Sequence, residues 1–184
     1  MGLTGKRNAF DRIIGNTSLA VLGKADAPVL AIPSTSKFEG IENLVYTTNF
    51  EFRDLGAINY LGEWAKVFKA AVHCLHTIEK EENESHVMKN MNILKTTYKG
   101  KHWVDFDMEY GKFKEEIEGF AKVKKADIIV MMSHKTNIIN RVLVPDSVKD
   151  IALTINTPIL VIKDNAFEVD NKTWELQGLM EDIG

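Results

Sequence analysis

The sequence predicts an α/β fold: a five-stranded, mostly parallel sheet with helices on both faces, preceded by a turn-helix-strand piece of a second copy. Three observations support this prediction. From Ile41 onward the hydrophobic period switches repeatedly between strand and helix spacing. The run from Asp127 to Met132 (DIIVMM) is short and almost entirely apolar, which is typical of a parallel strand buried on both faces. Finally, a segment near the start resembles a segment near the end.

The first half of the pattern gives a strand, a helix and a second strand. Residues 43–48 (NLVYTT) predict a strand, and apolar residues then recur at helical spacing from Leu55 to Phe68, with Asp54 near the helix start. Residues 70–77 (AAVHCLHT) predict the next strand. A helix follows, marked by Val87, Met91, Leu94 and Tyr98, and it is expected to end at Gly100.

The second half continues the alternation. Residues 103–110 alternate apolar and polar side chains, as a third strand would, and residues 113–124 carry apolar side chains at helical spacing. Residues 127–132 are the fourth strand. A last helix, at about residues 148–155, leads into residues 158–162 (PILVI), the fifth strand. The complete domain is therefore expected over residues 41–163.

An internal repeat defines the rest of the organisation. Residues 16–33 (NTSLAVLGKADAPVLAIP) match residues 147–163 (SVKDIALTINTPILVIK), and both segments predict a turn, a helix, a proline and an apolar strand. We therefore expect residues 1–33 to be the closing part of a first domain whose earlier strands are missing. Residues 34–40 (STSKFEG) are the expected linker, and residues 164–184 form an acidic tail.

A glycine pattern near the N-terminus suggests a family. Gly2, Gly5 and Gly15 are separated by two and then nine residues, and Asn16 follows the last glycine. This pattern resembles the nucleotide motif of the universal stress protein family. Leu75-His76-Thr77 is similar to the Leu-His-Val with which the family's second strand often ends, and the proline-led last strand also agrees. The resemblance covers about residues 1–163 and implies a Rossmann-like fold in a tandem, two-domain member.

The first copy of the motif has the chemistry of a phosphate site. Gly2, Gly5 and Gly15 allow backbone N–H groups to approach an anion without a Cβ atom in the way. Asn16 or Thr17 can cap the helix that follows, and the positive end of this helix would face the anion. The alternative is that these glycines only permit tight turns. We expect ATP binding to be possible in a full-length parent, but residues 1–33 lack the strands that would hold a base.

The second copy departs from the motif. Ser133 and Thr136 add Cβ atoms where backbone must approach closely, and Asp146 places a carboxylate where a phosphate would lie. Two like charges about 4 Å apart repel by roughly 1 kcal/mol even in bulk water. Pro145 removes one N–H donor. The family also uses an aspartate at the end of its first strand, whereas this chain has Thr47-Thr48-Asn49. We therefore expect no nucleotide, and no other cofactor, in the complete domain.

The remaining chemistry-bearing residues do not predict a metal site or an enzyme. His73, Cys74 and His76 are close in sequence, but on a strand His73 faces away from the other two. His86, His102 and His134 are scattered, and Ser133 and Ser147 lack a nucleophile motif. Met88, Met91 and Leu94 could form a soft binding stripe, but their helical spacing favours a core face of a helix. Lys122, Lys124 and Lys125 are expected to complement the dipole at a helix end.

The amino-acid composition limits the binding partners and the cell compartment that we expect for the protein. The net charge of -3, with no basic tract, argues against nucleic acid. The longest apolar run, residues 128–132, is far too short for a membrane span. One cysteine, Cys74, is compatible with a reducing compartment, so we expect a cytoplasmic protein. The resemblance further implies a dimer, or paired tandem domains, with residues 29–32 antiparallel to residues 159–162.

Three functional hypotheses follow. The first is a regulatory protein of the stress response, with an ATP-type phosphate motif in its first domain and a second domain that binds no nucleotide. The second is a nucleotide-independent scaffold for protein interaction or dimerisation that uses the acidic tail, whose Phe167, Trp174 and Leu176 lie among carboxylates. A third, slow ATP hydrolysis by a restored tandem, would need metal ligands that the sequence does not reveal.

Overall fold

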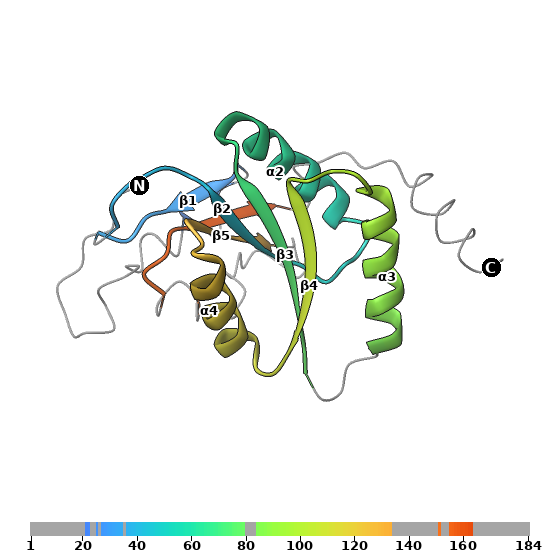
Figure 1. Cartoon of the computed structure of the whole chain (residues 1–184). Helices are drawn as coiled ribbons and strands as arrows, with labels where there is room; N and C mark the ends of the chain where they lie inside the picture. Colours follow the sequence, from blue (N-terminus) through green and yellow to red (C-terminus); the bar gives the residue numbers. More distant parts are fainter. Residues whose placement is uncertain are drawn as a thin grey trace.

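The computed structural model describes residues 21–22, 25, 27–34, 36–79, 84–133, 151 and 155–163. They form one six-stranded sheet with helices on both faces (Figure 1). The strands are β1 (Val29–Ala31), β2 (Asn43–Thr47), β3 (Ala71–Ile78), β4 (Val104–Tyr110), β5 (Ile128–Ser133) and β6 (Ile159–Lys163). The helices are α2 (Asp54–Phe68), α3 (Glu84–Thr97) and α4 (Phe113–Lys124).

The order of strands across the sheet is β1-β6-β5-β2-β3-β4. Among the described residues, strands β2 to β6 run parallel to one another, and β1 runs antiparallel to β6. The predicted α/β class with five parallel strands is therefore confirmed. Because β2 lies between β3 and β5, the chain moves outward from β2 in one direction and later returns to its other side. Such a reversal of strand order opens a crevice beyond the carboxyl ends of the strands.

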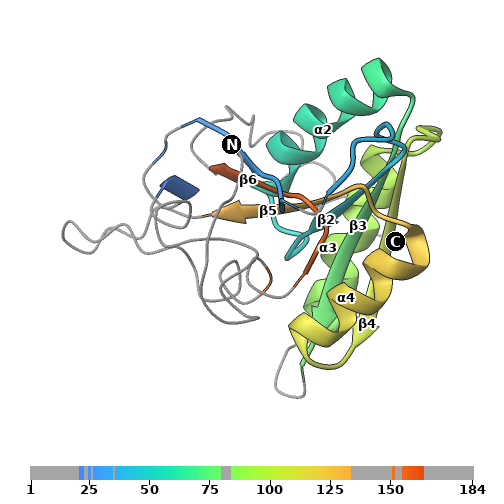
Figure 2. The same ribbon diagram turned by 90° about the vertical axis from the view of Figure 1, so that its left-hand side faces the viewer.

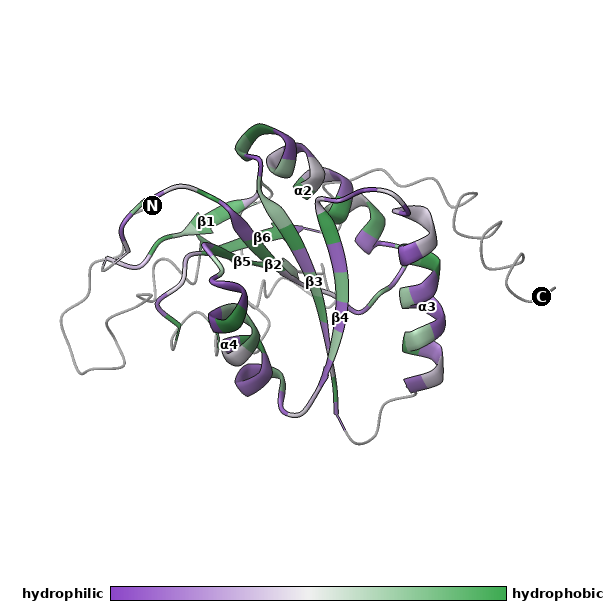
Figure 3. Cartoon of the chain, in the orientation of Figure 1, coloured by the Kyte–Doolittle hydropathy of each residue, from purple (hydrophilic) through white to green (hydrophobic). Residues whose placement is uncertain are grey.

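Two hydrophobic cores cover the two faces of the sheet. Helices α2 and α3 pack on one face, where Tyr46, Phe50 and Leu94 are fully buried. Helix α4 packs on the other face, with Ile117 and Phe120 against Val45. Figures 1 and 2 show α4 separated from α2 and α3 by the sheet. Figure 3, coloured by residue hydropathy, shows mostly hydrophobic residues in β1 and β5 and a mixture of hydrophilic and hydrophobic residues along each helix.

The boundaries of the elements agree closely with the predicted ones. Of the helix expected at about residues 148–155, the structure describes Ile151, which is helical and fully buried, and Ile155. None of the described helices has the length and apolar character needed to cross a bilayer. The acidic tail, residues 164–184, lies outside the described residues.

The N-terminal segment packs onto the domain through β1. Val29 lies opposite Val161, Leu30 opposite Leu160, and Ala31 opposite Ile159. The expected antiparallel pairing of these strands is confirmed, and it occurs within one chain. Val21 and Leu22 are helical, and Leu22 is buried in the core on the α4 face. The Lys163 ammonium donates to the Leu22 carbonyl at 3.3 Å, which suits a cation near the end of a helix.

Candidate functional site

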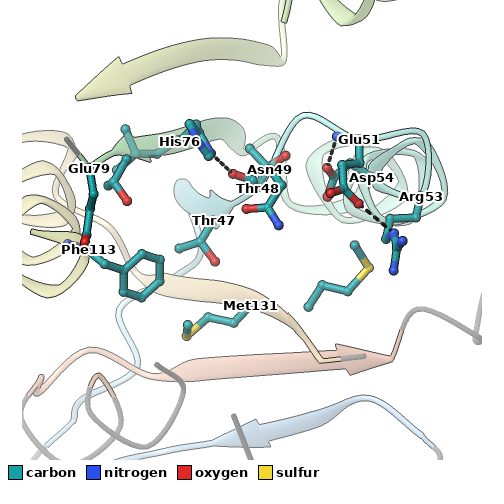
Figure 4. Close-up of a pocket in the computed structure, with 13 residues that line it drawn as sticks. Thr47, Thr48, Asn49, Glu51, Arg53, Asp54, His76, Glu79, Phe113 and Met131 are labelled. Carbon is teal, nitrogen blue, oxygen red and sulfur yellow. Dashed lines mark hydrogen bonds and ion pairs between the residues drawn. The ribbon is translucent and has the colours of Figure 1, made fainter. Parts of the chain in front are cut away.

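A cavity of about 440 Å³ lies at the carboxyl ends of β2, β3 and β5. This is the position where the strand order reverses, and ligands of open α/β sheets bind at such positions. Figure 4 shows Glu79 and Phe113 at one end of the cavity and Glu51, Arg53 and Asp54 at the other. The other lining residues are Thr47, Thr48, Asn49, Leu75, His76, Thr77, Met131 and Met132.

The loop after β2 shapes one wall of the cavity. Phe50 has a positive φ of 53°, which is unusual for a bulky residue, and its side chain is fully buried. Its amide N–H donates to the Thr48 hydroxyl at 2.8 Å, and its ring packs against His76 and Phe106. His76 Nδ1 lies 2.7 Å from the Thr48 carbonyl oxygen. Packing and hydrogen bonds together therefore hold the strained turn.

Asp54 begins α2 and is buried beneath the cavity wall. Its Oδ1 accepts a hydrogen bond of 2.5 Å from the Tyr46 hydroxyl, and its Oδ2 accepts one of 2.7 Å from the Glu51 amide. Burial raises the pKa of the Asp54 carboxyl, although these hydrogen bonds oppose the increase. Burial, followed by the charge of Asp54, raises the pKa of Tyr46. The phenol therefore remains a donor to the carboxyl.

The charges around the cavity are predominantly negative. Three carboxyl groups line it, those of Glu51, Asp54 and Glu79, whereas Arg53 is the one cation among the described lining residues. The Arg53 Nε lies 2.9 Å from Glu51 Oε2, so its charge is partly compensated by a neighbour. An electrically negative cavity is unfavourable for a triphosphate.

The β5 side of the cavity corresponds to the second copy of the glycine motif. Ser133, the first position of that copy, is buried, and its Oγ lies 3.4 Å from the Lys163 Nζ. The next positions, Thr136, Pro145 and Asp146, lie outside the described residues, as does His134. The same is true of the candidate phosphate-binding residues Gly2, Gly5, Gly15, Asn16 and Thr17.

Most polar residues of the cavity are not predicted by the sequence patterns. Thr47-Thr48-Asn49 contains no acid, but the following turn brings Asp54 and Glu51 to the same end of the sheet. Glu79, which follows β3, was also not predicted. The signal that could have found these residues is their position directly after the carboxyl ends of β2 and β3.

The structure separates the three residues considered as metal ligands. Cys74 is buried in the core beneath α2 and α3, and burial raises the pKa of its thiol well above the usual value. His73 faces the opposite side, where its ring contacts Phe120. Its Nδ1 lies 2.9 Å from the carboxylate oxygens of Asp105, and its Nε2 lies 3.2 Å from Asn43 Oδ1. The predicted division between the faces of β3 is confirmed.

Two further expectations are refined. Met91 and Leu94 are core residues of α3, but the prediction for Met88 was wrong, because its side chain is 43% exposed on the outer face of the helix. Lys122 and Lys124 do lie in the last turn of α4. Lys124 also forms ion pairs with Asp105 at 3.4 Å and Asp107 at 3.3 Å, linking the helix to the edge strand.

Comparison with known proteins places the chain in a family. The model of the universal stress protein family matches residues 44–163. A universal stress protein from Archaeoglobus fulgidus DSM 4304 has 16% identity and a TM-score of 0.68, covering 94% of this chain. A putative universal stress protein from Pseudomonas aeruginosa UCBPP-PA14 has 17% identity and a TM-score of 0.70, covering 98% of this chain. This chain spans 61% and 66% of those two proteins, respectively.

A third solved structure is a universal stress protein in complex with cAMP. It has 14% identity and a TM-score of 0.52, and the alignment covers 68% of this chain and 99% of that one. No curated protein matches the sequence. At these identities the structural similarity establishes the fold alone, and the family model establishes the relationship. The chain belongs to the universal stress protein family.

Proposed function

We propose that the protein is a regulatory module of the stress response whose complete domain, residues 41–163, does not bind ATP. The observation that carries this proposal is the set of carboxyl groups around the cavity at the end of β2. Glu51 and Asp54 lie at one end, where Arg53 offsets part of their charge, and Glu79 lies at the other, so a triphosphate placed between them would face an excess of negative charge.

The β5 side of the cavity supports the same proposal. Ser133 stands where the nucleotide motif has its first glycine, so its Cβ occupies space that a close backbone approach would need. Its hydroxyl is within hydrogen-bonding distance of Lys163, and the Lys163 ammonium also donates to Leu22. The Lys163 ammonium beside Ser133 therefore also contacts the N-terminal segment.

We further propose that residues 1–33 are the end of a first domain and carry its phosphate motif, Gly2, Gly5, Gly15, Asn16 and Thr17. The pairing of β1 with β6 supports this idea. In the sequence repeat Pro28 corresponds to Pro158, so Leu30 corresponds to Leu160. These two equivalent residues lie opposite each other, while Val29 and Ala31 lie opposite Val161 and Ile159. This register has the approximate two-fold symmetry expected of two similar domains that join their last strands.

The second candidate is a scaffold that works without nucleotide, and the same symmetry favours it. Because β1 and β6 are equivalent and self-complementary, two copies of the chain could exchange β1 and form a dimer with unchanged pairing. In this role the protein would have no catalytic residues, and the N-terminal motif would serve only as a turn.

Nucleotide titrations distinguish the two candidates. ATP, a non-hydrolysable ATP analogue and cAMP would each be titrated into this chain and into a chain that carries a complete preceding domain, with calorimetry as the measurement. The regulatory proposal expects no saturable binding to this chain, and binding to the longer chain that is lost in the Gly5→Asp variant. A Glu79→Gln variant is the control and should leave that binding unchanged.

The results of these titrations distinguish the two candidate functions. Nucleotide binding to neither chain would support the scaffold, which sedimentation would then test as a dimer. Nucleotide binding to residues 41–163, strengthened by Glu79→Gln, would overturn the proposal that this domain binds no nucleotide.

A further inference from the structure

A second cavity, of about 890 Å³, lies at the opposite end of the sheet, at the amino ends of β3 and β4. It lies between the end of α2 and the connection from α3 to β4. We call it the basic groove, and its lining residues are Asn59, Gly62, Glu63, Ala65, Lys66, Lys69, Ala70, Ala71, Tyr98, Gly100, Lys101, His102 and Trp103.

The basic groove carries an excess of positive charge. Lys66, Lys69 and Lys101 line it together with His102, against the single carboxylate of Glu63. None of these three lysines forms an ion pair with another residue in the described part of the chain. Lys66 and Lys69 complement the negative end of the α2 dipole, but Lys101 lies outside any helix. The helix dipole therefore accounts for only part of the charge.

The floor of the groove is apolar. The Trp103 ring lies so close to α2 that only a glycine fits at position 62, since a Cβ atom there would be 2.8 Å from Trp103 Cη2. Tyr98 packs edge-on against Trp103, and its hydroxyl donates to Asn59 Oδ1 at 2.8 Å. A ligand that combines negative charge with apolar side chains would match both the rim and the floor.

We propose that the chain's own acidic tail, residues 164–184, docks in the basic groove. The tail has six carboxylates and only one cation, Lys172. It also has apolar residues at helical spacing, namely Leu176, Leu179, Met180 and Ile183. The basic groove lies at the opposite edge of the sheet from the cavity at the end of β2. This proposal therefore does not depend on whether the domain binds nucleotide.

The length of the tail permits this contact. The tail starts after Lys163, at the carboxyl edge of the sheet, and the groove lies at the amino edge. An extended chain covers about 3.3 Å per residue, so residues 164–173 can span roughly 30 Å, which is more than the length of β3. Residues 174–184, which hold three of the carboxylates and most of the apolar residues, would then reach the groove.

Zero-length carbodiimide cross-linking of the full chain, read by mass spectrometry, tests the proposal. We expect Lys66, Lys69 and Lys101 to be the main lysines joined to tail carboxylates. A Lys66→Glu/Lys69→Glu variant should lower the cross-links between Lys101 and the tail at least threefold. The matched control is Lys122→Glu/Lys125→Glu, because these lysines occupy the same two positions, last turn and left-handed cap, at the end of α4.

A further variant exchanges the charges of the basic groove and the tail. Adding Glu175→Lys, Glu181→Lys and Asp182→Lys to the Lys66→Glu/Lys69→Glu variant should restore cross-links, which would now join the new tail lysines to the carboxylates introduced at positions 66 and 69. Circular dichroism checks that each variant is folded. The proposal is overturned if the tail is joined mainly to lysines outside the groove, if the control variant has the same effect, or if isotopically mixed samples show that the links connect two different chains.

Discussion

The Tyr46 hydroxyl donates a 2.5 Å hydrogen bond to the buried carboxyl of Asp54, which connects the end of β2 to the start of α2. Removing one partner leaves a buried polar group without its hydrogen bond, and for a charged group this costs about 1.5–3 kcal/mol. We expect Tyr46→Phe to lower the free energy of unfolding by about this amount, measured by urea denaturation. Tyr98→Phe is the control, because the Tyr98 hydroxyl donates to the neutral Asn59 amide. Losing this hydrogen bond should cost about 1 kcal/mol.

The hydrogen bond between Tyr46 and Asp54 also affects how the stability of the protein depends on pH. The pKa of Asp54 is raised in the folded protein, so its protonated form is favoured by folding and its contribution to stability falls as pH rises through the folded pKa. Tyr46→Phe removes a group that lowers this pKa. The decline in stability should therefore extend to higher pH in the variant than in the wild type, as measured by urea unfolding at a series of pH values. Identical pH profiles would contradict this account of the site.

The pKa of Asp105 is shifted in the opposite direction, below its usual value. Partial burial alone would raise its pKa, but the hydrogen bond from His73 and the charge of Lys124 hold the pKa of Asp105 below the usual value. Its contribution to stability is present above the unfolded pKa and is lost as pH falls through the folded pKa. We expect Asp105→Asn to cost roughly 1 kcal/mol near neutral pH and much less in acid. Chemical denaturation at the two pH values measures the difference.

Two helical glycines offer a paired test of packing. At Gly62 a Cβ atom would meet the Trp103 ring, whereas at Gly119 it would meet nothing within 4 Å. We expect Gly62→Ala to destabilise the protein by about 1–3 kcal/mol through overpacking, in spite of the better helix propensity of alanine. Gly119→Ala should stabilise it by about 0.5–1 kcal/mol. Thermal unfolding that shows the same sign for both variants would refute the packing of Trp103 on α2.

The β1–β6 pairing can be tested by a charge within it. In Leu30→Asp a carboxylate would lie opposite Leu160, so we expect β1 to detach and the β6 edge to become available to a second chain. Limited proteolysis should then cleave near residues 32–40, and sedimentation should show a higher mass. Ile32→Asp, which changes a partly exposed residue beyond the paired register, serves as the control.

The sequence predicted the fold well because its hydrophobic periods are strong and its strands are short and separate. The predicted ends of α2 and α4 agree with the structure, although the left-handed residues that follow them are Lys69 and Lys125 rather than the usual glycine. Helix α3 ends at Thr97, before the expected Gly100. The prediction for Met88 was wrong because methionine is tolerated on either face of a helix.

The cavity was less predictable than the strands around it. Its polar residues come from a turn in which Phe50 has a positive φ, and this conformation is stabilised by packing against His76 and Phe106. No local pattern encodes such tertiary contacts. Asp54 could be predicted as a helix start, but its hydrogen bond to Tyr46 depends on how the turn returns to the sheet.

The contact between Leu22 and Lys163 joins positions 141 residues apart, and β1 pairs with the last strand of the sheet. A ribosome would therefore release β1 long before its partner strand is made, and loop closure over such a distance slows folding. The pairing between β1 and β6 therefore forms only after β6 emerges, and it is expected to be among the last steps in the folding of this chain.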